Sequence, residues 1–233
     1  MADKTRAAFT GFAPESLEFF RNLAVNNSKT WFEAHRWEYE ECLLEPLKAL
    51  VAELSGFMLA IDQDLVTAPG RAVSRIHRDT RFSRDKSPYK TTMWLTFKRQ
   101  VMEWRDSPCW FFEITADSYR YGMGFYSASK ETMDRVREVI ERKPALFRQA
   151  VAFLGEQDSF VLEGETYRRA LRPDLPEDLQ RWHQRKNLYL DYNRQPDNAL
   201  FTRRLVDDLR QGFTLLAPFY DFLWKVKIPM GNG

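Results

Sequence analysis

The sequence has 233 residues, of which 44% are hydrophobic and 15% aromatic, so it supports a substantial buried core and excludes a disordered chain. Its 35 basic and 33 acidic side chains leave a formal net charge of +2, which excludes a protein that binds nucleic acid over its whole surface. No window approaches the roughly 18 apolar residues of a membrane span, and the N-terminus lacks the apolar stretch of a signal peptide. We therefore expect a cytoplasmic protein without a membrane segment.

Pro14 begins the first helical pattern, because proline fits a first helical turn whose amide would be unpaired in any case. A longer amphipathic pattern runs through residues 32–58. Pro46 lies inside it and is expected to kink or divide the helix, since it lacks an amide hydrogen.

Apolar side chains then alternate with other residues in three stretches, 93–97, 110–114 and 119–125. This period of two is typical of strands with one buried face. Asp117 and Ser118 favour a tight turn between the last two stretches. Because no helical pattern separates the three stretches, they predict neighbouring antiparallel strands.

Helical patterns return over about residues 130–140 and 144–154 and near Trp182, with short strands expected at 160–162 and 187–192. A final helix is expected from about Asp197 to Val226, followed by a loose tail from Ile228. Together the patterns predict a single α+β domain over residues 1–233. We expect an antiparallel sheet of about five to seven strands, with long helices packed mainly on one face.

Positive charge is concentrated in residues 71–90, which hold seven basic and two acidic side chains, an excess of five against two for the whole chain. If residues 73–82 form a strand, Arg75, His77, Asp79 and Arg81 share one face. Two guanidinium groups beside one carboxylate suit either internal ion pairs or a bound phosphate. The turn-prone residues that follow supply further donors for an anion. The candidate ligand-binding residues are Arg75, Arg78, Asp79, Arg81, Lys86, Tyr89 and Lys90.

Three interpretations of this basic motif remain open. A phosphate-bearing small molecule is the leading candidate ligand, with arginine and lysine stabilising negative charge if the protein is an enzyme. A noncatalytic module could instead bind a protein or nucleic acid through the same residues, although the balanced total charge disfavours nucleic acid. The motif could also only brace a sheet edge.

Few other residues suggest chemistry. Glu113 interrupts an apolar strand and, with Asp79, is a candidate acid or base. Gly122 and Gly124, two residues apart on one strand, indicate that a ligand or a packed side chain approaches the backbone closely. Lys186 is a further cation without a motif. No spacing of cysteines or histidines predicts a metal site, no motif assigns a cofactor, and the oligomeric state is not predicted.

Several stretches together resemble a bacterial and fungal family, DUF2461, a domain of unknown function. They are FTGF (residues 9–12), LAVNNSKTWFEAHRWEYE (23–40), SRIHRDTRFSRDKSPYKT (74–91) and YRYGMGFY (119–126). His77 departs from the aromatic residue expected at its position in the third stretch. The resemblance implies an α+β domain. It implies no activity and transfers no catalytic residue to this chain.

Overall fold

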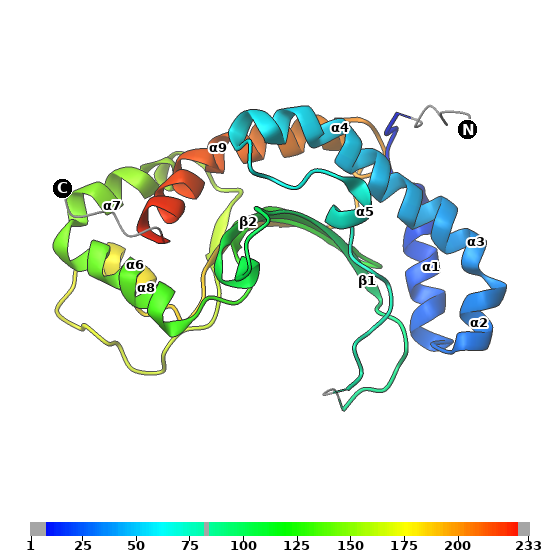
Figure 1. Cartoon of the computed structure of the whole chain (residues 1–233), viewed down its shortest axis with the longest axis horizontal. Helices are drawn as coiled ribbons and strands as arrows, with labels where there is room; N and C mark the ends of the chain where they lie inside the picture. Colours follow the sequence, from blue (N-terminus) through cyan, green and yellow to red (C-terminus); the bar gives the residue numbers. More distant parts are fainter. Residues whose placement is uncertain (1–7, 82–83, 228–233) are drawn as a thin grey trace. The chain divides into compact units, whose positions relative to one another are not determined.

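The structure is a computed structural model that describes residues 8–81 and 84–227 (Figure 1). Phe82 and Ser83 of the basic motif lie outside these residues, as does the tail that the sequence predicts to be loose. The chain divides into two compact units. Unit 1 comprises Met1–Phe97, Phe111–Tyr121 and Asn193–Gln211, and unit 2 comprises Lys98–Trp110, Gly122–Tyr192 and Gly212–Gly233. This division does not test the expectation of one domain over residues 1–233, which stays a prediction.

The described strands form one five-stranded antiparallel sheet with the order β1-β2-β3-β5-β4. The strands are β1 (Thr92–Phe97), β2 (Pro108–Thr115), β3 (Tyr119–Phe125), β4 (Val161–Glu163) and β5 (Tyr189–Arg194). Each of the three alternating stretches in the sequence is a strand, and the two shorter predicted strands also form. The α+β class and the strand number are therefore confirmed.

Helices precede and follow the strands. Unit 1 contains α1 (Pro14–Val25), α2 (Lys29–Ala34), α3 (Arg36–Tyr39), the π-helical turn η1 (Glu40–Leu44), α4 (Glu45–Ile61) and α5 (Pro69–Ala72). Unit 2 contains the short 3-10 helices η2 (Trp104–Asp106) and η3 (Ala152–Glu156), with α6 (Lys130–Arg142), α7 (Pro144–Val151) and α8 (Glu177–His183). The last helix, α9 (Arg204–Lys227), contributes residues to both units. Across the described part of the chain, none of these helices combines the length and apolar character needed to cross a membrane.

Pro46 divides the second helical pattern as the sequence predicts. The chain forms the π-helical turn η1 directly before α4, whose first turn contains the proline. In an uninterrupted α-helix the amide of residue 46 would donate to the carbonyl of Cys42, but proline has no amide hydrogen. The fully buried Ser16 of α1 donates its hydroxyl to that carbonyl instead, at 2.6 Å. A side chain from a neighbouring helix thus satisfies the acceptor that the proline leaves open.

The core of unit 1 lies on one face of the sheet, where α4 and α5 pack on β1 (Figure 1). Met93 and Leu95 on this face are fully buried, as is Leu54 of α4. Gly11 lies at another close contact: its φ is +120°, and a Cβ there would lie 2.3 Å from the carbonyl carbon of Phe201. Only glycine tolerates both the conformation and the approach, which accounts for the glycine in the FTGF stretch.

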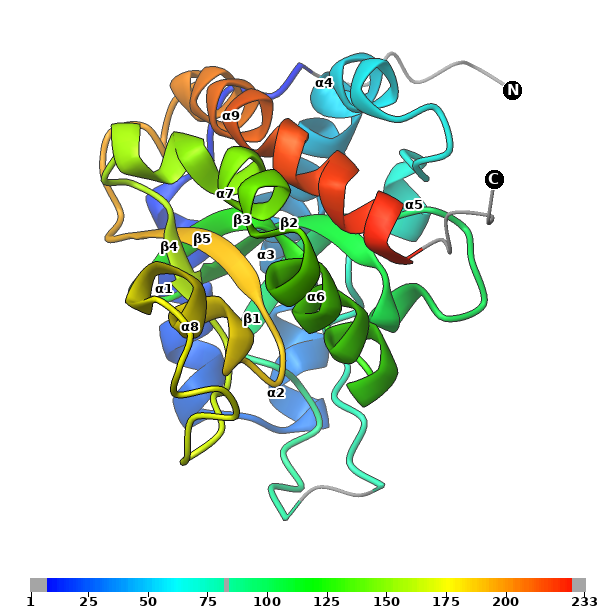
Figure 2. The ribbon, with the colours of Figure 1, turned by 90° about the vertical axis from the view of Figure 1, so that its left-hand side faces the viewer.

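Aromatic side chains form the core of unit 2. The indole of Trp110 on β2 lies 5.0 Å from the ring of Phe213 and 4.9 Å from that of Tyr220, both on α9. Figure 2 shows β4 beside β5, and the two strands pair antiparallel with Leu162 opposite Leu190. The ring contacts of Trp110 bury a large apolar area. The pairing with β5 fixes β4 at the edge of the sheet.

The final helix begins at Arg204, later than the predicted start near Asp197. The carboxylate of Asp197 accepts hydrogen bonds from the backbone amide of Ala199 at 2.9 Å and from the hydroxyl of Tyr119 at 3.0 Å. An aspartate that bonds to amides just beyond it stabilises a turn in competition with the helix. The contact with Tyr119 on β3 joins residues 78 positions apart, so the local pattern could not have indicated it.

Candidate functional site

The described part of the basic motif forms two extended arms, residues 73–81 and 84–90, which together we call the basic hairpin. Within the described residues, the arms pair with each other at one isolated bridge, His77 with Tyr89, and a second bridge joins Val73 to Leu95 of β1. A regular strand, considered above as one possibility for residues 73–82, does not form in their described part. The reason lies beyond His77, where Asp79 accepts from the amide of Arg81 and Asp85 accepts from the amide of Ser87. These local turns compete with a continuous ladder of backbone hydrogen bonds.

Asn27 anchors the base of the basic hairpin. Its side-chain amide donates to the carbonyl of Tyr89 at 3.0 Å and accepts from the amide of the same residue at 3.1 Å. The ring of Tyr89 stacks on Phe32 of α2, with 4.0 Å between ring centroids, and is only 3% exposed. The predicted ligand residue Tyr89 therefore serves the packing of the hairpin base.

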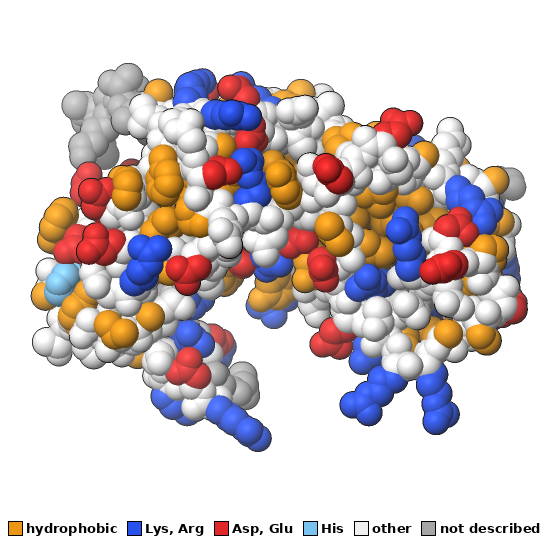
Figure 3. Space-filling model, turned by 180° about the vertical axis from the view of Figure 1, so that it is seen from behind, with side chains coloured by type: hydrophobic (Ala, Val, Ile, Leu, Met, Phe, Trp, Pro, Cys, Tyr) orange, Lys and Arg blue, Asp and Glu red, His pale blue; other side chains and the backbone are white. Residues whose placement is uncertain are grey.

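Near the tip, Asp79, Arg81 and Lys86 all bond within the hairpin. Asp79 binds Arg81 through two hydrogen bonds of 2.9 and 2.7 Å. The ammonium group of Lys86 donates to the carbonyl of Thr80 at 2.9 Å. Figure 3, where the tip is the lower left projection, shows basic and acidic side chains together there. The hydrogen bonds from Arg81 lower the pKa of Asp79 to about 2, so this carboxyl group is a poor proton carrier at neutral pH.

Three cations gather at the base of the basic hairpin, and we call Arg75, Arg78 and Lys90 the base cluster. Burial, followed by the charges of the two arginines, lowers the pKa of Lys90 to about 8. Arg78 pairs with Asp85 at 2.9 Å, and its buried Nε has no hydrogen-bond acceptor among the described residues. Within residues 8–81 and 84–227, neither Arg75 nor Lys90 forms an ion pair with a carboxylate. Positive charge at the base is thus only partly balanced by the protein.

Glu113, the second candidate acid or base, forms its ion pair with an arginine outside the basic motif. It pairs with Arg120 on the neighbouring strand β3 at 2.8 Å, and the two side chains are 24% and 32% exposed. The guanidinium of Arg120 also lies 5.6 Å from the ring centroid of Phe111. The structure therefore gives Glu113 a cross-strand ion-pair partner.

Gly122 and Gly124 do mark a close approach, but the approaching group is the backbone of β5. A Cβ on Gly122 would lie 1.9 Å from the carbonyl oxygen of Leu190, and one on Gly124 would lie 2.4 Å from the Cα of Tyr189. The predicted close approach is therefore confirmed, and at Gly124 the approaching atoms include the side-chain Cβ of Tyr189. The two glycines allow β3 and β5 to lie close together, and the alternation in the sequence does not indicate which strand is the neighbour.

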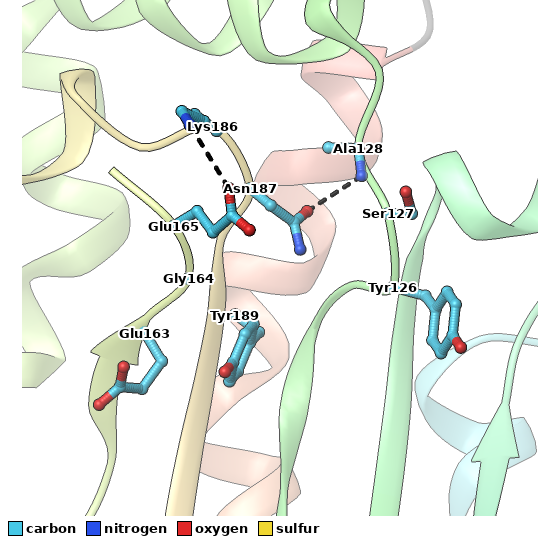
Figure 4. Close-up of a pocket in the computed structure, with 9 residues that line it drawn as sticks. All are labelled: Tyr126, Ser127, Ala128, Glu163, Gly164, Glu165, Lys186, Asn187 and Tyr189. Carbon is cyan, nitrogen blue, oxygen red and sulfur yellow. Dashed lines mark hydrogen bonds and ion pairs between the residues drawn. The ribbon is translucent and has the colours of Figure 1, made fainter. Parts of the chain in front are cut away.

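Unit 2 contains a separate open pocket of about 600 Å³, between β4, β5 and the segment after β3 (Figure 4). Its shape depends on Asn187, whose side chain accepts from the amide of Ala128 at 3.0 Å and donates to the carbonyl of Phe125 at 3.2 Å. Lys186 pairs with Glu165 at 3.4 Å, as Figure 4 shows. The lining residues are Tyr126, Ser127, Ala128, Glu163, Gly164, Glu165, Lys186, Asn187 and Tyr189.

Sequence reasoning found only Lys186 of this pocket, because its other residues come from three segments and share no local pattern. The lining holds two carboxylates against one ammonium group. This excess of negative charge repels an anion, so we do not expect the pocket to bind the phosphate group considered for the base cluster.

No curated protein matches this sequence. A family model described as "Conserved hypothetical protein (DUF2461)" matches residues 15–222 of the 233. The match includes the basic hairpin and the glycine-containing strand β3, and it begins after the FTGF stretch. The chain therefore belongs to the DUF2461 family of conserved hypothetical proteins.

Proposed function

We propose that the base cluster binds a small molecule through a phosphate group. The observation that carries this proposal is that Arg75 and Arg78 lie close enough to Lys90 for their charges to act on it, while among the described residues the one ion pair that these three cations form joins Arg78 to Asp85. Bringing like charges together at a half-buried site is unfavourable, and a bound dianion removes that repulsion. Guanidinium groups also match the geometry of phosphate oxygens, to which they donate two hydrogen bonds at once.

The proposal centres on the base rather than the tip of the basic hairpin. Arg81 is held by Asp79, and Lys86 donates to a backbone carbonyl. A ligand at the tip would have to displace these partners, whereas Arg75 and Lys90 have no carboxylate to release among the described residues. Arg75 and Lys90 are therefore the principal proposed ligands, with Arg78 as support and Arg81 and Lys86 as secondary contacts.

We propose that the base cluster binds its ligand, and we propose no chemical reaction there. Preorganised cations stabilise developing negative charge in many enzymes, and the base cluster has that character. Its acid and base candidates are engaged elsewhere, since Asp79 pairs with Arg81 and Glu113 with Arg120. The competing function is a noncatalytic module that binds nucleic acid through the same cations. The affinity of such a module would fall steeply with salt concentration, which distinguishes it from a small-molecule site.

A thermal-shift screen of the full chain tests the proposal directly. Inorganic phosphate, ribose 5-phosphate and a short oligonucleotide are compared as ligands for the parent protein and the Arg75→Ala and Lys90→Met variants. Arg71→Ala is the matched control, because Arg71 is an exposed arginine of neighbouring α5 outside the base cluster.

We expect a shift with phosphate-bearing small molecules that both base-cluster variants lose and the control retains. A ligand at about 100 times its dissociation constant stabilises by roughly 2.7 kcal/mol, which is readily measured. A shift that survives both variants would contradict the proposal. A shift only with the oligonucleotide, falling steeply with salt, would favour the nucleic-acid module.

A further inference from the structure

The carboxylate of Asp85 is bound by two donors that also suit a phosphate oxygen. Its Oδ2 lies 2.9 Å from Nη1 of Arg78, and its Oδ1 accepts a hydrogen bond from the backbone amide of Ser87 at 2.9 Å. Guanidinium groups and backbone amides are common donors to phosphate oxygens in proteins. In the protein without ligand, Asp85 therefore takes donors that a ligand's phosphate would use.

Arg78, the partner of Asp85, lies on the same face of the basic hairpin as Lys90. The amide of Arg78 donates to the opposite arm at 2.9 Å, and the amide of Lys90 donates back at 2.9 Å, on either side of the bridge between His77 and Tyr89. Side chains alternate along each arm, so Arg78 and Lys90 both point away from the face that carries the bridged pair. They are diagonal neighbours, a separation that long side chains can span. A phosphate held by Lys90 is therefore within reach of Arg78.

The ion pair between Arg78 and Asp85 is suited to exchange. The two side chains are 30% and 51% exposed, and exposed ion pairs contribute little to stability. A phosphate that contacted Arg78 while Asp85 stayed in place would bring two anions within a few ångströms of each other, which is unfavourable. Asp85 therefore has to leave Arg78 before a ligand's phosphate takes that guanidinium.

We propose that Asp85 is an internal competitor for the ligand's phosphate, bound to Arg78 in the free protein and replaced there when the ligand binds. This inference rests on the proposed anion site and adds how that site is regulated. A carboxylate carries one negative charge, whereas a phosphate monoester carries about two at neutral pH. The ligand therefore gains more from the base cluster than Asp85 does, and the exchange lowers the affinity below what the cations alone would give.

Calorimetric titration of ribose 5-phosphate into the full chain and into Asp85→Asn tests the competition. Asparagine keeps an oxygen that can accept from the Ser87 amide, so the local turn is retained while the charge is lost. The strength of an exposed ion pair corresponds to a few-fold change in affinity, so we expect Asp85→Asn to bind about threefold or more tightly. Asp117→Asn is the matched control, because Asp117 pairs with Arg21 at 3.6 Å outside the basic hairpin, and it should bind as the parent does.

A second pair of variants shows whether Asp85 acts through Arg78. Competition requires the guanidinium, so adding Asp85→Asn to Arg78→Met should change the affinity by less than about 1.5-fold. Equal tightening with and without Arg78 would show that Asp85 only repels the ligand, and would overturn the competition while the anion site stands. Unchanged or weaker binding by Asp85→Asn, with binding by the parent, would also overturn the competition alone. Absence of binding by the parent and by every variant would overturn the proposed function as well.

Discussion

At the scale of single residues, the structure shows how individual polar groups compensate for one another. Pro46 removes a backbone donor, and the buried hydroxyl of Ser16 supplies a replacement to the carbonyl of Cys42. Lys90 shows the opposite situation, a half-buried cation whose neighbours Arg75 and Arg78 repel it. The bond from Ser16 to Cys42 stabilises the fold. The crowding of cations around Lys90 is unfavourable for stability, and such perturbed groups are found most often at functional sites.

Ser16→Ala should destabilise the protein by about 1–3 kcal/mol, because the partly buried carbonyl of Cys42 would lose its donor. Denaturant unfolding of the parent and the variant measures this loss. In a Pro46→Ala background, the restored amide can donate to the same carbonyl, so Ser16→Ala should cost less there. Equal costs in the two backgrounds would show that the serine and the proline are not coupled.

Lys90 should make stability depend on alkaline pH. Its pKa in the folded protein is about 8, below the ordinary value of 10.5, so the unfolded chain binds more protons between these values. The free energy of unfolding should therefore rise with pH from about 8 to about 10.5, by roughly 1 kcal/mol after allowance for solvent screening. Lys90→Met should lack this rise when the two proteins are unfolded in urea across that range. A parallel pH dependence in both would contradict the assignment.

At the scale of elements, the basic hairpin and the β3–β5 contact depend on partners far away in the sequence. Asn27 holds Tyr89 across 62 positions, and Gly122 accommodates the carbonyl of Leu190. The alternation within the hairpin predicted a strand, but Asp79 and Asp85 each form a local turn that interrupts pairing. Periodicity therefore identified which side chains share a face, and side-chain hydrogen bonds decided whether a regular strand formed.

Asn27→Ala should loosen the base of the basic hairpin. Both hydrogen bonds to the backbone of Tyr89 are lost, at a cost of about 2 kcal/mol in the free energy of unfolding. Amide hydrogen exchange should accelerate at Arg78 and Lys90, whose amides complete the pairing of the two arms. Asn26→Ala is the matched control, since the Asn26 side chain bonds only within α1 and is exposed. Equal exchange rates in the two variants would show that Asn27 does not hold the base of the basic hairpin.

Gly122→Ala should destabilise the sheet by more than about 3 kcal/mol, because the new Cβ would overlap the carbonyl oxygen of Leu190 at 1.9 Å. Gly56→Ala provides the contrast, since nothing lies within 4 Å of the corresponding Cβ. Alanine is the better helix former, so this second change should stabilise α4 by up to about 1 kcal/mol. Thermal unfolding of both variants measures the difference, and similar melting temperatures would contradict the close strand contact.

At the scale of the whole molecule, the sequence was informative wherever one local pattern determined an element. The strands with Met93, Trp110 and Tyr119 and the helix that begins at Pro14 follow from apolar spacing and proline placement. The site was predicted only in part. Spacing located the basic motif, but the separation between a self-paired tip and the base cluster depends on tertiary contacts. The pocket around Asn187 draws on three distant segments, so no period in the sequence marks it.

The function that we propose for the protein is binding of a small molecule's phosphate group by the base cluster. Calorimetric titration of ribose 5-phosphate into the parent protein, Lys90→Met and the control Arg71→Ala tests it most directly. We predict that Lys90→Met weakens binding at least about tenfold, the equivalent of about 1.4 kcal/mol, while Arg71→Ala binds as the parent does. Equal affinities for all three proteins, or no binding by the parent, would contradict the account.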